Sequence, residues 1–361
     1  MRRIVITGNQ GYVGPVVARR LRARFPAARL IGVDIGLFAD CTTSVRIGHP
    51  ELDGVDEQWR KDIRDVTPED LEDVDGIVHL AAVSNDPMGH AFEAATHEIN
   101  HRGTVHVARA AAAAGVRRFV FASSCSVYGS AGNRSCSEES EIAPLTAYAA
   151  SKAAAERGLA QIARSDFGVT ALRFATACGA SPRVRLDLVL NDFVATALTA
   201  KRIDLLSDGT PWRPLIDVGD MAQAVAWALA RPDGGYLALN VGKDDWNFQV
   251  KDLAQMVSSV CGDVPISLNR SAAPDPRTYT VDFGRCEANT VLRGRSASLR
   301  TTVENLQRSL RRSRHLDANF RRSRFSRMHV LSQLHAHGRV DSALRPRPAS
   351  IALFHLGGGV A

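Results

Sequence analysis

A tyrosine and a lysine four residues apart are the first candidates for catalysis. Tyr148 and Lys152 lie in the alanine-rich stretch "AYAASKAAAERGLAQIAR", which predicts a long helix. Side chains four positions apart on a helix lie on one face, one turn from each other. A tyrosine titrates at about pH 10, and a nearby ammonium stabilises its phenolate form. We interpret Tyr148 as a candidate catalytic base and Lys152 as the cation that lowers its pKa, against the alternative of an ordinary solvated pair.

A glycine-rich turn near the start of the chain predicts a phosphate-binding loop. The apolar run "RIVIT" is followed by three glycines spaced three apart, which are Gly8, Gly11 and Gly14. A helix expected to begin near Tyr12 would aim free N–H groups and its positive end at a pyrophosphate. Asp34 ends the next apolar run, 20 positions after Gly14, where its carboxylate can bind an adenosine ribose and would repel a 2′-phosphate. The pattern predicts NAD over NADP, the alternative being a structural turn and a surface aspartate.

The elements that must position these residues alternate along the first half of the chain. Short apolar runs rich in β-branched and aromatic residues stand between helical stretches, which is typical of a parallel sheet with crossover helices. We expect a doubly wound parallel α/β (Rossmann) sheet over residues 1–178, with a return segment near 214–242. A smaller mixed α/β substrate-binding domain is expected from 179–213 and 243–314, where "SLRTTVENLQRSLRRS" predicts a last amphipathic helix. Residues 315–361 form a basic tail to which the sequence assigns no role.

Charge and cysteine usage narrow the class of protein. The 361 residues carry a formal charge of +7, but the chain from Arg293 onward holds 14 arginines and 3 acidic residues, so the part before it has 31 basic against 35 acidic residues. We interpret the basicity as solvated tail charge and expect no nucleic-acid partner. The six cysteines show no Cys-x-x-Cys pair, and the chain has neither a signal peptide nor an apolar run of about 20 residues. We expect a reduced, cytoplasmic protein with no metal and no membrane partner.

Further motifs follow the glycine turn in a fixed order, and together they resemble the extended short-chain dehydrogenase/reductase superfamily, the nucleotide-sugar epimerases and dehydratases. These motifs are "DIRD" at residues 62–65, which resembles the family's adenine-contacting turn, "HLAA" at 79–82, "INHRGT" around Asn100, "SSCSVYG" and "YAASK". The resemblance covers roughly residues 1–310. It implies NAD contacts from Gly8, Gln10, Gly11, Tyr12, Val13, Gly14, Asp34, Asp62, Ile63, Leu80, Ala81, Ala82, Asn100, Ser123, Tyr148 and Lys152.

The resemblance also implies a reaction. Ser124, four residues before Tyr128 in "SSCSVYG", stands where the family has a Ser or Thr that binds the reacting sugar hydroxyl. The family's 4,6-dehydratases place an Asp-Glu pair directly after this residue, where this chain has Cys125 and Ser126. That departure favours epimerisation through a transient keto sugar over dehydration. Cys125 could act as a soft acid or base, although a buried cysteine is more often inert packing.

Substrate contacts are implied in the second half of the chain. Asn191, Arg213 and Arg277 match positions that hold the nucleotide diphosphate, and arginine binds phosphate oxygens in pairs. Asp86 and His90, in "SNDPMGH", are candidates for the hexose, so the expected substrate is a nucleoside-diphosphate hexose. The alternatives are a 4,6-dehydratase, a net oxidoreductase and a non-catalytic NAD-binding regulator. By resemblance we expect a homodimer.

Overall fold

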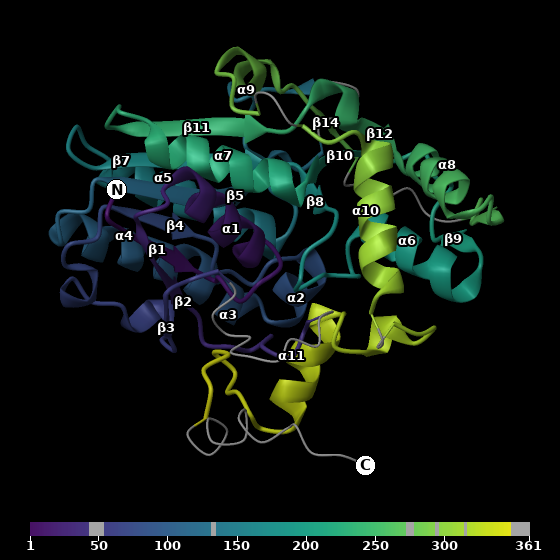
Figure 1. The fold of residues 1–361 in the computed structure, drawn as a ribbon, viewed down its shortest axis with the longest axis horizontal. Helices are drawn as coiled ribbons and strands as arrows, with labels where there is room; N and C mark the ends of the chain where they lie inside the picture. Colours follow the sequence, from purple (N-terminus) through teal and green to yellow (C-terminus); the bar gives the residue numbers. More distant parts are fainter. Residues whose placement is uncertain (43–53, 131–134, 272–277, 293–295, 314–315, 348–361) are drawn as a thin grey trace.

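The centre of the molecule is a seven-stranded parallel sheet (Figure 1). The computed structural model describes residues 1–42, 54–130, 135–271, 278–292, 296–313 and 316–347. The sheet has the order β11-β7-β5-β4-β1-β2-β3, with bounds β1 (Arg3–Thr7), β2 (Arg29–Val33), β3 (Glu57–Trp59), β4 (Gly76–His79), β5 (Arg118–Ser124), β7 (Gly168–Phe174) and β11 (Tyr236–Val241). The chain runs outward from β1 to one edge, returns to β4 and continues to the other edge. This order confirms the predicted doubly wound sheet.

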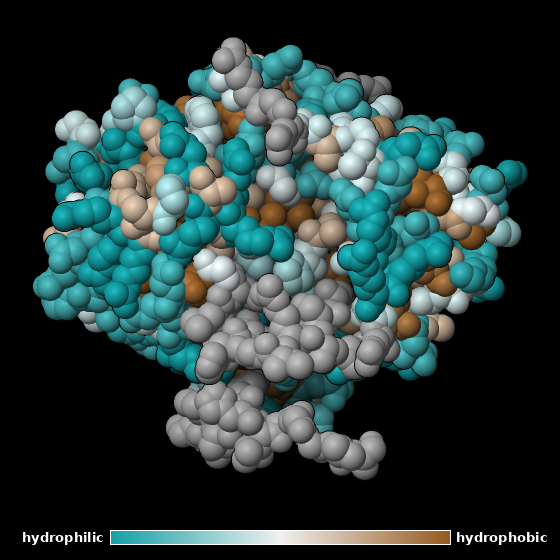
Figure 2. Space-filling model, viewed as in Figure 1, coloured by the Kyte–Doolittle hydropathy of each residue, from teal (hydrophilic) through white to brown (hydrophobic). Residues whose placement is uncertain are grey.

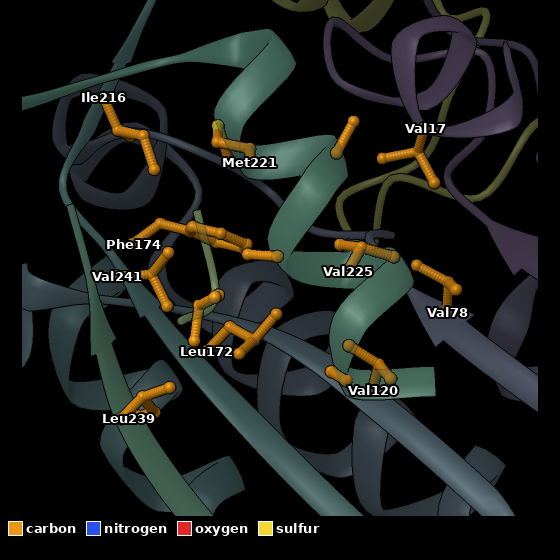
Figure 3. Close-up of a cluster of buried hydrophobic side chains, with 14 of the residues drawn as sticks. Val17, Val78, Val120, Leu172, Phe174, Ile216, Met221, Val225, Leu239 and Val241 are labelled. Carbon is orange, nitrogen blue, oxygen red and sulfur yellow. The ribbon is translucent and has the colours of Figure 1, made fainter. Parts of the chain in front are cut away.

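Helices cover both faces of the sheet because successive strand residues point to opposite faces. Ile4 and Ile6 of β1 face one core, with α1 (Gly14–Arg24) and α7 (Val218–Ala230). Val5 faces the other, with α4 (Thr104–Ala113) and α5 (Ala147–Ile162). Figure 3 shows Met221 and Val225 of α7 among side chains from β4, β5, β7 and β11. The two cores hold the strand ends rigidly.

A break in helical geometry follows β4. The chain passes through α2 (Asp86–Ala91), α3 (Glu93–His97) and a π-helical turn, η4 (Glu98–Gly103), before it enters α4. Wide turns of this kind are rare and are often found at functional sites. Here the turn surrounds Asn100, which is fully buried.

A second group of elements packs around its own core beside the sheet. The helices are α6 (Val189–Ala200), α8 (Val250–Cys261) and α10 (Leu299–Arg311); the strands are β8 (Thr176–Cys178), β9 (Ile203–Leu205), β10 (Trp212–Asp217), β12 (Asn247–Gln249) and β13 (Ile266–Leu268). The short elements β6 (Ser135–Cys136), β14 (Thr280–Val281) and α9 (Gly284–Ala288) lie near β11 (Figure 1). The buried stripe of α10 (Leu299, Val303, Leu306 and Leu310) confirms the predicted amphipathic helix.

The last described segment, residues 316–347, packs against the body of the molecule. Phe320 and Phe325 join the second core, and α11 (Arg327–Ala336) contacts α2 (Figure 1). The Arg327 side chain is 2% exposed and donates a hydrogen bond to the Arg183 carbonyl (3.0 Å). The prediction that the tail charge is solvated is therefore wrong for Arg327, whereas Arg321, Arg322, Arg324 and Arg347 are exposed. Single large apolar residues anchor the segment, and they leave no regular period in the sequence.

The outer surface is mainly hydrophilic in the view of Figure 2, with apolar residues in small separate areas. Within the described ranges, the longest apolar helices still fall short of what a membrane crossing requires.

Candidate active site

A cavity of about 1080 Å³ lies at the carboxyl ends of β1, β2, β4 and β5. Ligands of doubly wound sheets bind at this edge, where the strand order reverses. The volume lies at the upper end of the range for ligand sites, as a site for a cofactor and a substrate requires. Sixteen of the predicted site residues line it: Gly8, Gly11, Tyr12, Val13, Asp34, Asp62, Ile63, Leu80, Ala81, Ala82, Asp86, Ser123, Ser124, Tyr148, Lys152 and Arg213.

The glycine turn passes too close to other backbone to carry side chains. Gly8 has φ +70°, and a Cβ there would lie 2.5 Å from the Ala81 nitrogen. A Cβ on Gly14 would lie 2.1 Å from the Asn9 carbonyl oxygen, so this glycine permits α1 to start against the turn although it does not line the cavity itself. The result is a shallow cradle of backbone at the start of α1, of the kind that accepts a pyrophosphate.

Asp34 stands at the end of β2 with its carboxylate fixed by backbone. Its oxygens accept hydrogen bonds from the nitrogens of Gln10 (3.1 Å) and Gly36 (2.8 Å). Burial raises the pKa of Asp34, and these two hydrogen bonds oppose that rise. Gln10 does not line the cavity, and its backbone nitrogen positions the Asp34 carboxylate.

The predicted catalytic pair is positioned by the cap of α5. Thr146 Oγ1 accepts a hydrogen bond from the Ala149 nitrogen (3.2 Å) and donates one to Asp86 Oδ1 (2.7 Å), so α5 starts against the first residue of α2. Lys152 Nζ lies 5.9 Å from the centre of the Tyr148 ring and donates a hydrogen bond to the Ala122 carbonyl (2.7 Å). Both side chains therefore meet the end of β5 inside the cavity.

Burial dominates the titration of this pair. It lowers the pKa of Lys152 to about 7, with Glu156 acting in the opposite direction. It raises the pKa of Tyr148 to about 12, and the opposing influences are a hydrogen bond with Ser124 and the charge of Arg185. The sequence predicts that Lys152 lowers the Tyr148 pKa. In the structure this phenol stays protonated at neutral pH, because desolvation of the phenolate outweighs the hydrogen bond with Ser124 and the charge of Arg185.

At the end of β5, the side chains of the catalytic candidates Ser124 and Cys125 point in different directions. Ser124 Oγ accepts hydrogen bonds from the Ser126 nitrogen (3.2 Å) and hydroxyl (2.9 Å), and both serines line the cavity. Cys125 points into the core, where its Sγ donates to the Arg173 carbonyl (3.1 Å) and burial raises its pKa. The prediction of a catalytic Cys125 is therefore wrong, since its thiol does not reach the cavity and is held protonated.

Two asparagines that were predicted to contact ligands, Asn100 and Asn191, form hydrogen bonds with the backbone of the protein instead. The Asn100 amide accepts from the Val83 nitrogen (2.8 Å) and donates to the Val83 carbonyl (2.9 Å) and to Ser151 Oγ (3.1 Å). The Asn191 amide accepts from the Gly179 nitrogen (3.0 Å) and donates to the Arg185 carbonyl (2.8 Å). Both side chains are fully buried and neither lines the cavity, so both predictions are corrected: these residues hold loops around the site.

Two further predictions have other outcomes. His90 is exposed and lies outside the cavity, so it is not placed to meet a sugar there. Arg277 lies outside the described residues.

Sequence reasoning missed a buried ion pair in the cavity wall. Arg185 Nε and Nη2 each lie 3.0 Å from a carboxylate oxygen of Asp187, and Asn85 Nδ2 donates to Asp187 Oδ2 (2.9 Å). The charge of Arg185 acts on Tyr148. The sequence gives no signal of this burial, because the alternation of "RVRLDL" at residues 183–188 predicts arginines on the solvated face of a strand.

A second network of buried polar side chains lies beside β5. Glu156 binds Arg173 (Nη2 to Oε2, 2.7 Å) and accepts a hydrogen bond from the Ser123 hydroxyl. Arg173 Nη1 donates to the Tyr128 hydroxyl (3.0 Å), which donates to Asn240 Oδ1 (2.6 Å). The network connects α5, β5, β7 and β11 and fixes the backbone that carries Ser124.

Comparison with known proteins places the chain in a family. It is 27% identical over 303 residues to a UDP-glucose 4-epimerase of Streptomyces lividans, covering 78% of this chain and 88% of that protein. The solved structure of MoeE5 in complex with UDP-glucose and NAD has a TM-score of 0.72 at 26% identity, covering 86% of this chain and 99% of that one. DesIV, a dTDP-glucose 4,6-dehydratase from Streptomyces venezuelae solved with NAD and TYD bound, has a TM-score of 0.72 at 25% identity, covering 88% and 99%. The model of the NAD dependent epimerase/dehydratase family matches residues 4–242, and the chain belongs to that family.

Proposed function

We propose that this protein catalyses NAD-dependent epimerisation of a nucleoside-diphosphate hexose through a transient keto sugar. The observation that carries the proposal is one cavity that joins the glycine turn and Asp34 to Ser124, Tyr148 and Lys152. A similar enzyme is a UDP-glucose 4-epimerase, and a similar solved structure holds UDP-glucose with NAD. The family is NAD-dependent.

The residues present fit a dinucleotide. The turn at Gly8 leaves no room for a Cβ, and Asp34 ends β2 with a carboxylate ready for ribose hydroxyls. Bound here, NAD would supply an acceptor, and later a donor, for the hydride of the reacting sugar carbon. We propose that it is held by Gly8, Gly11, Tyr12, Val13, Asp34, Asp62, Ile63, Leu80, Ala81, Ala82 and Ser123, all of which line the cavity.

Tyr148 moves the proton in this mechanism. As the sugar carbon loses its hydride, Tyr148 Oη accepts the proton of the attached hydroxyl, while the Ser124 hydroxyl donates a hydrogen bond to the same oxygen. Tyr148 gives the proton back when the hydride returns to the other face of the carbon. Because burial holds its pKa at about 12, the tyrosine needs a positive charge brought into the cavity before it can act as a base.

Lys152 and Arg213 support this chemistry. Lys152, with a pKa of about 7, can hold a ribose hydroxyl and remain partly cationic near neutral pH. Arg213 lines the cavity from β10, where a guanidinium can bind two phosphate oxygens at once. We propose it as a ligand of the substrate diphosphate, with Asp86 as a contact of the hexose.

A 4,6-dehydratase is the second candidate, because DesIV is similar to this chain. Dehydration needs acid and base groups at the neighbouring carbons, yet Cys125 lies in the core and Ser126 is a neutral hydroxyl. Asp86 lines the cavity and binds the cap of α5, the helix that carries Tyr148. Its carboxylate could still act as the acid or base of a dehydration.

The test uses deuterated water and a panel of UDP-, dTDP-, GDP- and CDP-hexoses. We expect a product of changed configuration at C4 without carbon-bound deuterium, since the hydride leaves and returns without exchange. Deuterium at C5 or C6, or loss of one water, would favour the dehydratase, and a stoichiometric demand for NAD would indicate net oxidation. The control variant Tyr148→Phe should keep its NAD and lose several orders of magnitude in turnover. A wild-type protein that holds NAD but converts no sugar, with Tyr148→Phe indistinguishable from it, would favour a regulator.

We further propose that the protein is a cytoplasmic homodimer. All six cysteines are free thiols, which is typical of a reducing compartment. Light scattering on the purified protein measures the oligomeric state directly.

A further inference from the structure

We propose that the C-terminal segment, residues 316–347, is part of the cofactor site and slows the release of NAD by closing the cavity over its adenosine half. The inference rests on the proposed function, in which Asp34 binds a ribose of NAD and Ile63 is one of the residues that hold the cofactor. The segment lies outside the part of the chain that matches the family model, residues 4–242. It would therefore be a binding element that the family motifs do not contain.

Two leucines of this segment form part of the cavity wall. Leu331 of α11 and Leu344 are each 1% exposed and line the same cavity as Ile63 and Ile99. They belong to a cluster with Val83 from the loop after β4. An apolar surface at this position fits the face of a purine ring. Covering the ring removes its apolar area from water, which favours the bound state.

The backbone at Leu344 is held in an unfavourable conformation. Its φ is +57°, in the left-handed region that a leucine rarely adopts. The turn is fixed by Asp341, whose Oδ1 accepts hydrogen bonds from the nitrogens of Ala343 (2.9 Å) and Arg345 (2.8 Å). Strain of this kind persists only where surrounding contacts outweigh it. Here it directs the Leu344 side chain into the cavity wall.

The same turn is joined to the predicted adenine turn, η2 (Ile63–Asp65). Arg345 binds both carboxylate oxygens of Asp65 (2.7 and 3.1 Å), and Arg64 Nη1 donates to the Ala343 carbonyl (2.8 Å). Arg64 also binds Asp62, through Nε to Oδ1 (2.9 Å) and Nη2 to Oδ2 (2.6 Å). We call these contacts of Arg64 and Arg345 the clasp. It connects the Leu344 turn to the element that carries Ile63.

The start of the segment is anchored by other contacts in the cavity wall. Arg327 donates to the Arg183 carbonyl (3.0 Å), and its guanidinium lies 5.1 Å from the centre of the Phe38 ring. Arg321 binds Asp192 of α6 (2.7 Å). Because the segment is fixed at both ends, with its leucines between them, the clasp must open before a ligand under it can leave.

Two variants separate the clasp from the wall. Arg345→Ala removes the ion pair with Asp65, and Leu344→Ala removes apolar wall. The matched control is Arg347→Ala, which removes an exposed arginine two residues further on. Each full-length protein is loaded with NAD and mixed with excess isotopically labelled NAD, and the unlabelled NAD that stays bound is followed by mass spectrometry. Circular dichroism reports whether each variant is folded.

We expect Leu344→Ala to release NAD roughly tenfold faster than wild type, because a leucine-sized contact is lost from the bound state. Arg345→Ala should release it severalfold faster, and wild-type release should accelerate with added salt, which screens the exposed Arg345–Asp65 pair. Arg347→Ala should match wild type. If Leu344→Ala fails to fold, the half-exposed Arg345→Ala decides the question.

Release at the wild-type rate in folded Arg345→Ala and Leu344→Ala would overturn this inference and leave the proposed function intact. Equal acceleration in Arg347→Ala would also overturn it, because the effect would then not come from the clasp. A wild-type protein that binds no NAD at all would refute the cofactor placement itself, so the two failures are distinguishable.

Discussion

The substitution Glu156→Gln should destabilise the protein strongly, because it leaves a buried arginine without its counter-ion. The side chains of Glu156 and Arg173 are 4% and 6% exposed and lie 2.7 Å apart. Glu156 accepts hydrogen bonds from Arg173 Nε (3.1 Å) and from the Ser123 hydroxyl as well. A glutamine keeps the shape but removes the charge, and the guanidinium, whose pKa this pairing raises, cannot lose its proton.

Breaking a buried ion pair on one side typically costs about 3–5 kcal/mol of unfolding free energy. The entropy of unfolding scales with length and amounts to roughly 0.8 kcal/mol per kelvin for 361 residues. The expected fall in Tm is therefore roughly 4–7 °C. The matched control is Glu139→Gln: Glu139 pairs with Arg285 at 3.2 Å, but its side chain is 86% exposed. Exposed pairs contribute about 0–1 kcal/mol, so the control should shift Tm by no more than about 1 °C.

Urea unfolding followed by circular dichroism measures both variants, with linear extrapolation to water. A loss in Glu156→Gln below about 1 kcal/mol, no larger than in the control, would refute the reasoning. It would mean that water or a rearranged side chain reaches Arg173, so that the network under β5 is not the rigid support we infer.

Two other predictions follow from the site. Cys125→Ala should keep turnover within a few-fold of wild type in a steady-state assay, because the thiol bonds to the Arg173 carbonyl and does not line the cavity; a loss of several orders of magnitude would restore a chemical role for it. The pH dependence of stability should carry the signature of Lys152, whose pKa falls from 10.5 to about 7 on folding. Between these values the unfolded chain binds the proton and the folded chain does not, so the stability of wild type relative to Lys152→Met should rise by up to about 1.4 kcal/mol per pH unit above pH 7. Urea titrations at several pH values from 6 to 8.5 check this, and parallel curves for the two proteins would contradict the buried, neutral lysine.

The fold and the glycine-turn side of the cavity wall could be predicted because both depend on short-range patterns. Apolar runs between helices specify the parallel sheet, and a glycine such as Gly8 is required wherever backbone approaches backbone. Asp34 follows from its place at the end of the second strand. These features need no knowledge of what packs against them.

The direction of individual polar side chains could not be predicted. Cys125 and Ser126 are neighbours in the sequence, but one enters the core and the other the cavity, since the chain turns into η5 (Cys125–Tyr128) at this point. Asn100 and Asn191 have the residue type of a ligand contact, yet the backbone of distant loops occupies both ends of each amide. Whether a polar group is free for a ligand depends on those tertiary partners, which the sequence does not reveal.

The C-terminal segment shows the same limit on a larger scale. Its basic composition predicts a solvated tail. Its buried apolar residues, Phe320, Phe325, Leu331, Val340 and Leu344, are too irregularly spaced to give a helical or strand period. Three of its arginines, Arg321, Arg327 and Arg345, bind groups from distant parts of the chain, which are Asp192, the Arg183 carbonyl and Asp65. Together these contacts hold the segment against the cavity, which Arg321, Arg327, Leu331 and Leu344 help to line. A basic tail can therefore belong to a binding site when the acidic partners lie around that site, and the location of those partners decides the interpretation.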